Sequence, residues 1–213
     1  MFIAILGRQP EISIAELEAV YGDKNVQKIS NQAATVNCDN LSIDNLGGTI
    51  KCGHVITKIK SQKSDRNTLL QASKIIVEKY TKKLSNSQKK ITLGISFYGN
   101  KMDPRNIQKI GIILKNNLKK SGVSLRLIPN KTAALSTATS HNNKLGRSEA
   151  KIEIIIARNV YGDLIVAESR GAQNINSYTQ RDRGRPKRDA FVGMLPPKLA
   201  QIIINLSGAK PND

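Results

Sequence analysis

The sequence is poor in the residues from which catalytic and metal centres are built. Its two cysteines, Cys38 and Cys52, and its two histidines, His54 and His141, have no companions at metal-ligand spacing. We therefore expect neither a zinc site nor a disulfide framework. No Gly-x-Gly-x-x-Gly or Walker loop is present to hold a nucleotide, and no carboxylate stands in an acid–base pattern with a histidine or lysine. These absences favour a binding module with no catalytic residue, cofactor or metal; the alternative is an enzyme of unfamiliar type.

Long apolar segments are also lacking. No run of about 18 apolar residues occurs, so we expect no transmembrane helix and no membrane partner. The apolar N-terminus, Met1 to Leu6, lacks the basic region and the cleavage site of a signal peptide. Two isolated cysteines are typical of a reducing compartment. The sequence therefore predicts a cytoplasmic protein.

Aromatic residues make up 4% of the chain and tryptophan is absent, whereas the net charge is +18. The charge is uneven: residues 1–57 carry −2, residues 58–170 carry +16 and residues 171–213 carry +4. Such asymmetry indicates a polyanionic partner. Proteins that grip single strands without sequence preference usually stack bases on several aromatic rings. The scarcity of aromatics instead favours contacts with the phosphates and the shape of a folded RNA or a duplex.

Hydrophobic periodicity predicts an α+β fold in three parts. Residues 1–57 read as a small domain with one helix, which starts at a capping box formed by Ser13 and Glu16, and three strands over FIAIL, AATVNC and TIKCGHVITKIK. Residues 58–170 read as αβαβαββ and end in a hairpin. Residues 171–213 read as a linker and a helix from Pro196 to Leu206. Its apolar stripe, Leu199, Ile202, Ile203 and Leu206, should pack on the first domain, because an isolated short helix is marginal in water.

The stretch from Arg126 to Arg147 is the main candidate for contact with a polyanion. We expect Pro129 to Thr132 to lead from a strand into a helix start, where backbone amides, a lysine and hydroxyls suit a phosphate. The alternative is a polar loop that only caps the helix. The candidate binding residues are Arg126, Asn130, Lys131, Thr132, Ser136, Ser140, His141, Asn142, Lys144 and Arg147. A second candidate is the basic linker, either a phosphate-contacting arm or a plain connection, with Arg181, Arg183, Arg185, Lys187 and Arg188.

Five blocks of sequence resemble a known family. They are ILGRQPEISIAELEAVYG, LGGTIKCGHVI, ITLGISFYG, LRLIPNKTAALSTATSHNNKLG and YTQRDRGRPKRDAFVGMLPPKLAQIIINLSG. They look like successive parts of the THUMP-containing tRNA guanosine-N2 methyltransferases, and the last block is the most specific. The resemblance implies an N-terminal ferredoxin-like domain over residues 1–57, a THUMP domain over 58–170, and a linker and helix over 171–213 that lead to a methyltransferase domain.

The family's catalytic motifs have no counterpart in this sequence. The strand–glycine motif that binds S-adenosylmethionine is missing, and in MLPPK Leu195 and Lys198 replace the acid or amide and the aromatic of the Pro-Pro motif. The resemblance therefore implies a targeting module that docks the acceptor end of tRNA, with the methyltransferase domain in cis or on a separate subunit. An alternative is an interaction subunit whose terminal helix and linker dock a catalytic methyltransferase that acts on RNA or DNA.

Overall fold

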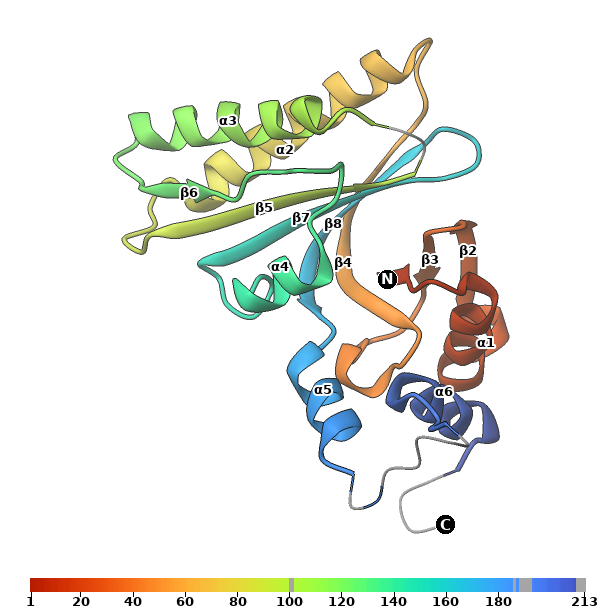
Figure 1. Ribbon diagram of the computed structural model, residues 1–213. Helices are drawn as coiled ribbons and strands as arrows, with labels where there is room; N and C mark the ends of the chain where they lie inside the picture. The colour runs from red at the N-terminus through yellow and green to blue at the C-terminus, as the bar shows by residue number, and fades with distance from the viewer. Residues whose placement is uncertain (100–101, 186, 188–192, 210–213) are drawn as a thin grey trace.

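The computed structural model describes residues 1–99, 102–185, 187 and 193–209. Within them the chain forms one mixed sheet of eight strands and six α-helices (Figure 1). The strands are β1 (Phe2–Leu6), β2 (Val26–Ser30), β3 (Ala33–Val36), β4 (Thr49–Ile59), β5 (Ile91–Tyr98), β6 (Leu125–Leu127), β7 (Lys151–Arg158) and β8 (Leu164–Ala172). The helices are α1 (Pro10–Tyr21), α2 (Asp65–Leu84), α3 (Pro104–Lys120), α4 (Thr137–Asn142), α5 (Ile175–Arg183) and α6 (Pro197–Ser207).

The strand order across the sheet is β2-β3-β1-β4-β8-β7-β5-β6. The first four strands are antiparallel neighbours, with β3 inserted between β1 and β2. At the other end β5 lies parallel to both β6 and β7, and β7 and β8 form the predicted antiparallel hairpin. The predicted αβαβαββ order of the middle segment is thus present as α2, β5, α3, β6, α4, β7 and β8.

Strand β4 joins the two ends of this sheet. It pairs with β1 on one side and with β8 on the other, and its Lys51, Cys52, Gly53 and His54 are in register with both neighbours. The predicted domain boundary between residues 57 and 58 falls inside β4. A buried apolar cluster extends across the same junction, where Ile3 and Ile5 of β1 share a core with Ile155 of β7. The two predicted halves therefore share a sheet and part of a core.

Helices α2 and α3 cover one face of β5 to β8, and α4 lies on the opposite face (Figure 1). Each long helix starts at a capping side chain: Ser64 accepts a hydrogen bond from the Asn67 amide, and Asp103 accepts one from Arg105. These caps satisfy backbone amides that have no partner inside a helix. The core beneath α2 and α3 contains one apolar stripe from each helix.

The predicted capping box at Ser13 and Glu16 is wrong. Helix α1 already begins at Pro10, so both residues lie inside it. The Ser13 hydroxyl donates to the carbonyls of Gln9 and Gly48. The fully buried Glu16 carboxylate accepts from the amides of Gly47 and Gly48, each at 2.8 Å. The pair thus fastens the loop before β4 to α1. The sequence reading also missed β2.

Helix α6 packs beside α1, as predicted (Figure 1). The Asn205 side chain donates to Glu16 Oε1 at 2.7 Å and to the Asn45 carbonyl at 2.8 Å. Only part of the predicted apolar stripe is covered: Ile202 is buried, whereas Ile203 and Leu206 are 47% and 46% exposed. Among the described residues, no helix combines the length and apolar character that a membrane span requires.

Candidate nucleic-acid interface

The candidate stretch from Arg126 to Arg147 starts at the outer strand of the sheet and ends beside β8. After β6 the chain continues alongside β5, with hydrogen bonds from Ile128 N to Leu93 O and from Phe97 N to Ala133 O. Helix α4 begins only at Thr137. The expectation that Pro129 to Thr132 lead directly into a helix start is therefore wrong, because these residues lie beside a strand.

Asn130 and Ser136, two of the predicted binding residues, hold the local backbone with their side chains. Asn130 Nδ2 donates to the carbonyls of Ile95 and Thr132, at 2.9 and 3.3 Å. Ser136 is the N-cap of α4, and its hydroxyl accepts from the Thr139 amide at 3.0 Å. For these two residues the structure favours the capping and loop-holding role that the sequence analysis gave as the alternative.

The remaining predicted residues differ in their exposure, and the exposed ones include four cations. His141 is half-buried and Ser140 is fully buried. The Thr132 hydroxyl, although exposed, donates to the Ala134 carbonyl at 2.8 Å. The exposed residues among these remaining ones are Arg126, Lys131, Thr132, Asn142, Lys144 and Arg147.

A small hollow of about 250 Å³ lies where α4 meets the end of β8. Ser140, His141, Lys144, Arg147 and Asn174 are among the residues that line it. The Ser140 hydroxyl is buried and has no hydrogen-bond partner in the described chain. Because almost none of its surface is accessible, this hydroxyl belongs to the wall of the hollow, and the exposed cations Lys144 and Arg147 are the groups that a ligand can reach. We call this the α4 hollow.

Arg147 lines both the α4 hollow and a neighbouring hollow of about 360 Å³. Arg170 and Cys52 also line the second hollow. Its guanidinium contacts Asp44, with Nη2 to Oδ1 at 3.1 Å, and both side chains are about half exposed. An exposed ion pair of this kind contributes little stability. Arg147 can therefore exchange Asp44 for a phosphate at small cost. Sequence reasoning missed Arg170 and Asn174, which follow the predicted stretch in the chain.

A buried polar network holds the backbone that leads into α4. Lys51 Nζ of β4 lies 2.5 Å from Glu153 Oε1 of β7, and both side chains are fully buried. Lys51 also donates to the Leu135 carbonyl at 2.8 Å, and the Leu135 amide donates to Ser96 Oγ at 3.0 Å. Burial lowers the pKa of Lys51, against the opposing effect of the Glu153 carboxylate. The network ties Leu135 to three strands and so positions α4 two residues later.

The second candidate, the basic linker, is partly helical. Arg181 and Arg183 lie in α5. The Arg181 guanidinium lies 5.1 Å from the centre of the Tyr178 ring. Arg185 donates to the Leu195 carbonyl at 2.6 Å, and Lys187 is exposed. Arg188 lies outside the described residues.

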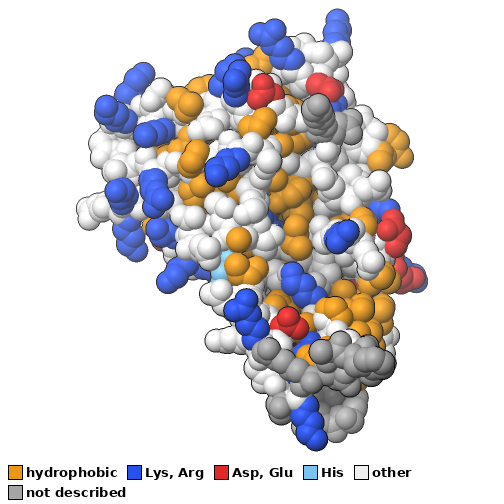
Figure 2. Space-filling model, in the orientation of Figure 1, with side chains coloured by type: hydrophobic (Ala, Val, Ile, Leu, Met, Phe, Trp, Pro, Cys, Tyr) orange, Lys and Arg blue, Asp and Glu red, His pale blue; other side chains and the backbone are white. Residues whose placement is uncertain are grey.

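Positive charge gathers on one side of the molecule. Figure 2 shows Lys and Arg side chains along the border formed by α3, the ends of β5 and β6, and α4, where Asp and Glu are scarce. In the part of the chain that the structure describes, no group of three or more His, Cys, Asp or Glu side chains could hold a metal ion. The face is therefore suited to polyanion binding.

The comparison with one solved structure supports the fold. No family model matches the sequence, and no curated protein matches it. Among solved structures, TrmN from Thermus thermophilus matches 98% of this chain with a TM-score of 0.53 and 11% identity. A 4-thiouridine synthetase–RNA complex with bound ATP and PH1313 from Pyrococcus horikoshii Ot3 each match 81% of the chain, with TM-scores of 0.41 and 0.40 and identities of 12% and 11%.

The chain spans only part of these structures: it covers 55% of TrmN, 41% of the synthetase and 55% of PH1313. At 11% identity the likeness to TrmN is one of fold. The protein therefore has the α+β fold of the corresponding part of TrmN.

Proposed function

We propose that this chain is an RNA-binding module of the THUMP type, which holds the acceptor end of tRNA, including its single-stranded 3′ terminus. The observation that carries the proposal is the α4 hollow, where the exposed cations Lys144 and Arg147 and the half-buried His141 line one site. The family resemblance in the sequence and the fold shared with TrmN support the same reading.

The chemistry of the hollow suits a nucleotide bound through its backbone. Lys144 and Arg147 supply charge and hydrogen-bond donors for a phosphate. Aromatic side chains for stacking are scarce, which favours recognition of the 2′-hydroxyl and phosphates. The module would thereby place a distant guanosine at a methyltransferase domain, in cis or on a separate subunit. That domain would supply S-adenosylmethionine and the catalytic residues.

The first prediction tests the charges of this site. Replacing Lys131, Lys144 and Arg147 together with alanine should weaken binding to a tRNA acceptor hairpin about 10- to 100-fold, because charge-assisted hydrogen bonds are lost. Each phosphate contact removed should also lower the slope of log affinity against log salt by about 0.7–0.9. Fluorescence anisotropy over a salt series measures both quantities.

A matched control removes as much charge elsewhere. Lys24, Lys58 and Lys63 are exposed and form no ion pair with any other described residue, and their triple alanine variant (the control triple) should bind nearly as well as the parent. If the parent does not bind the hairpin, or if both variants lose equal affinity, the proposed site is wrong. A DNA hairpin of the same sequence tests the choice of RNA, because only RNA carries the 2′-hydroxyl.

The second prediction concerns the buried hydroxyl alone. Ser140→Ala removes a group that has no partner in the free protein, so the free energy of unfolding should stay the same or rise by about 1 kcal/mol. Affinity for the hairpin should stay within about 2-fold of the parent, because the hydroxyl lies behind the surface that the RNA contacts. Urea unfolding and anisotropy together give both values. Ser136→Ala is the contrasting variant: it removes the α4 cap and should cost about 1 kcal/mol of stability. A stability loss in Ser140→Ala with unchanged affinity would assign the hydroxyl a purely structural role.

A second candidate function has its own supporting observation. Ile203, Ile204 and Leu206 of α6 are about half exposed and lie in the helix that packs beside α1, which exposes Val20. A cluster of exposed apolar side chains is typical of a protein-binding surface. The chain could then serve as an interaction subunit that docks a catalytic methyltransferase. Binding to such a partner would depend weakly on salt, whereas RNA binding would depend on it steeply, so the salt series separates the two functions.

A further inference from the structure

A larger basic groove lies at the outer edge of the sheet. It has a volume of about 550 Å³ and lies between the last turns of α3 and strand β6. Lys90, Lys115, Lys119 and Arg126 line it together with the chain from Gly122 to Leu125. We call it the β6 groove. Only Arg126 belongs to the stretch that the sequence analysis selected.

The charges around the β6 groove have no internal counterpart. None of the described residues that line it is acidic, and none of its four cations forms an ion pair elsewhere in the described chain. Lys115 and Lys119 stand one turn apart in α3, where like charges repel. The groove therefore concentrates unneutralised positive charge, and a bound polyanion would relieve that repulsion.

The helix dipole explains only part of this arrangement. A lysine in the last turn of a helix is favoured by the negative end of the dipole, which accounts for Lys119 and Lys120. It does not account for Lys90, which precedes β5, or for Arg126 in β6. Cations from helix α3, from strand β6 and from the turn before β5 line one hollow, which is typical of a binding groove rather than of helix stabilisation.

The β6 groove and the α4 hollow lie at the same end of three parallel strands. Ile91, at the start of β5, pairs with Leu125 of β6, and Thr92 pairs with Lys151 of β7. The Gly146 amide, next to Arg147, donates to the Lys151 carbonyl at 2.6 Å. The α4 hollow lies at the end of β8, three strand spacings from β6, and at about 4.8 Å per spacing these two strands are separated by about 14 Å. One nucleic-acid strand can therefore contact both sites.

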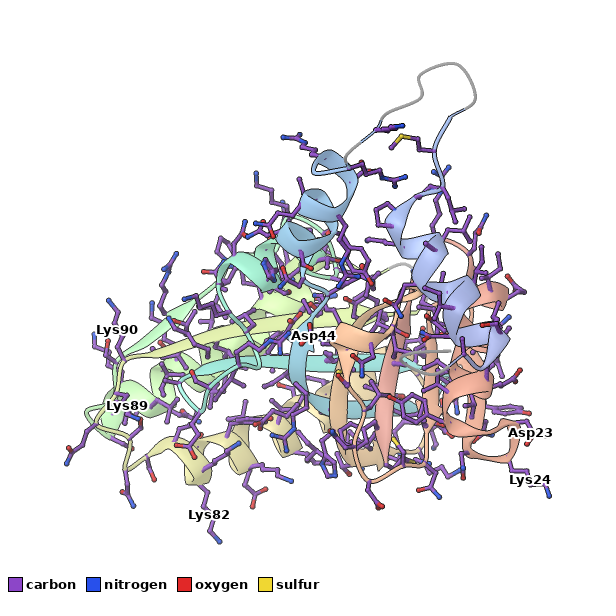
Figure 3. All side chains as sticks on the ribbon, turned by 90° about the horizontal axis from the view of Figure 1, so that it is seen from below. Asp23, Lys24, Asp44, Lys82, Lys89 and Lys90 are labelled. Atoms are coloured by element: carbon purple, nitrogen blue, oxygen red, sulfur yellow. The ribbon has the colours of Figure 1, made fainter. Side chains whose placement is uncertain are left out.

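Figure 3 shows where this end of the sheet lies in the molecule. Lys89 and Lys90 project from one end, and Asp23 and Lys24 lie at the opposite end. The basic side chains of the groove are thus remote from the acidic N-terminal segment, and Lys24 is a suitable site for a control substitution.

We propose that the β6 groove binds the phosphodiester backbone of the RNA duplex next to the single-stranded end held at the α4 hollow. The inference rests on the proposed function, since it extends the same RNA from its 3′ terminus into its stem. The α4 hollow then selects the single-stranded end, while the β6 groove measures whether a stem follows it. Recognition of the stem is through phosphates and therefore independent of its sequence.

The test compares two hairpin RNAs with the same single-stranded 3′ end, one with a long stem and one with a short stem. The variant replaces Lys90, Lys115 and Lys119 with alanine (the groove triple), and the control triple serves for comparison. For the long-stem hairpin, the groove triple should lower the salt slope by about 2–3, since about 0.9 is lost per phosphate contact. For the short-stem hairpin its slope and affinity should equal those of the parent.

The outcomes separate the two proposals. If the parent binds neither hairpin, the proposed function itself fails. A second outcome is that the parent binds and that the triple variant of Lys131, Lys144 and Arg147 is impaired. If the groove triple then matches the control triple on both hairpins, only the proposal for the β6 groove is overturned. Equal losses by the groove triple on long and short stems would also overturn it, because the groove would then not contact the stem. Circular dichroism checks that the substituted α3 remains helical.

Discussion

Replacing Lys51 with methionine should lower the free energy of unfolding by about 3–5 kcal/mol, because it leaves a buried carboxylate without its partner. Lys51 and Glu153 are both fully buried, and their charges lie 2.5 Å apart. Glu153 Oε2 already lacks a hydrogen-bond partner in the described chain. Among the described residues, the Ser96 hydroxyl, 2.6 Å from Oε1, would be the one remaining hydrogen-bond donor to the carboxylate. Urea unfolding followed by circular dichroism measures the change.

The double variant Lys51→Met/Glu153→Leu is the control for this prediction. Removing both charges together replaces the pair with apolar side chains, which is often neutral or even stabilising by about 1–4 kcal/mol. The double variant should therefore recover most of the stability that Lys51→Met loses. It should still bind RNA more weakly, because Leu135 loses its hydrogen bond from Lys51 and α4 is held less firmly. Equal stability of Lys51→Met and the parent would show that the pair does not matter to the fold.

The second large effect is expected at Gly47, which faces α6. A Cβ at this position would lie 2.8 Å from Ile202 Cγ1 and would collide with the Lys198 carbonyl. Gly47→Ala should therefore detach α6 from α1. A detached helix of this length is marginal in water, so the amides from Leu199 to Leu206 should exchange hydrogen at least about 100-fold faster than in the parent. Amides in β4 should keep their protection.

Two further variants sharpen this experiment. Ile202→Ala removes the buried contact of α6 and should also speed exchange, whereas Ile203→Ala changes an exposed neighbour and should leave exchange as it is. Unchanged protection of α6 in Gly47→Ala would mean that the loop can shift to make room, and that the contact does not hold the helix. Hydrogen exchange read by mass spectrometry resolves the segment.

The elements that the sequence predicts well are those determined by neighbouring residues. Helices α2 and α3 have a periodic apolar stripe and a local cap, at Ser64 and Asp103. The turn of the β7–β8 hairpin is also local, because Asn159 Oδ1 accepts from the amides of Tyr161 and Asp163. Helical periodicity and turn chemistry depend on spacing along the chain, so a single sequence contains the information.

The features that the sequence did not reveal depend on contacts between distant segments. Glu16 has the spacing of a capping box, yet its hydrogen bonds go to residues 31 and 32 positions away. Lys51 looks like a surface lysine in an alternating strand, and it is buried only because Glu153 and Leu135 surround it. In the same way Lys90 and Lys119 join Arg126 only through the packing of α3 against β6. Basic composition predicted the type of partner, while folding decides which cations converge.

The eleven-residue strand β4 has a consequence for how the protein can be divided. A cut between residues 57 and 58 would end the first fragment inside β4. In the second fragment, β8 would lose most of β4, the strand with which it pairs. Each fragment would present an unpaired strand edge, which invites aggregation with other chains. The segment before the cut also supplies Lys51, without which Glu153 on the far side is left charged and buried. The two halves should therefore fold stably only when both are present in one chain.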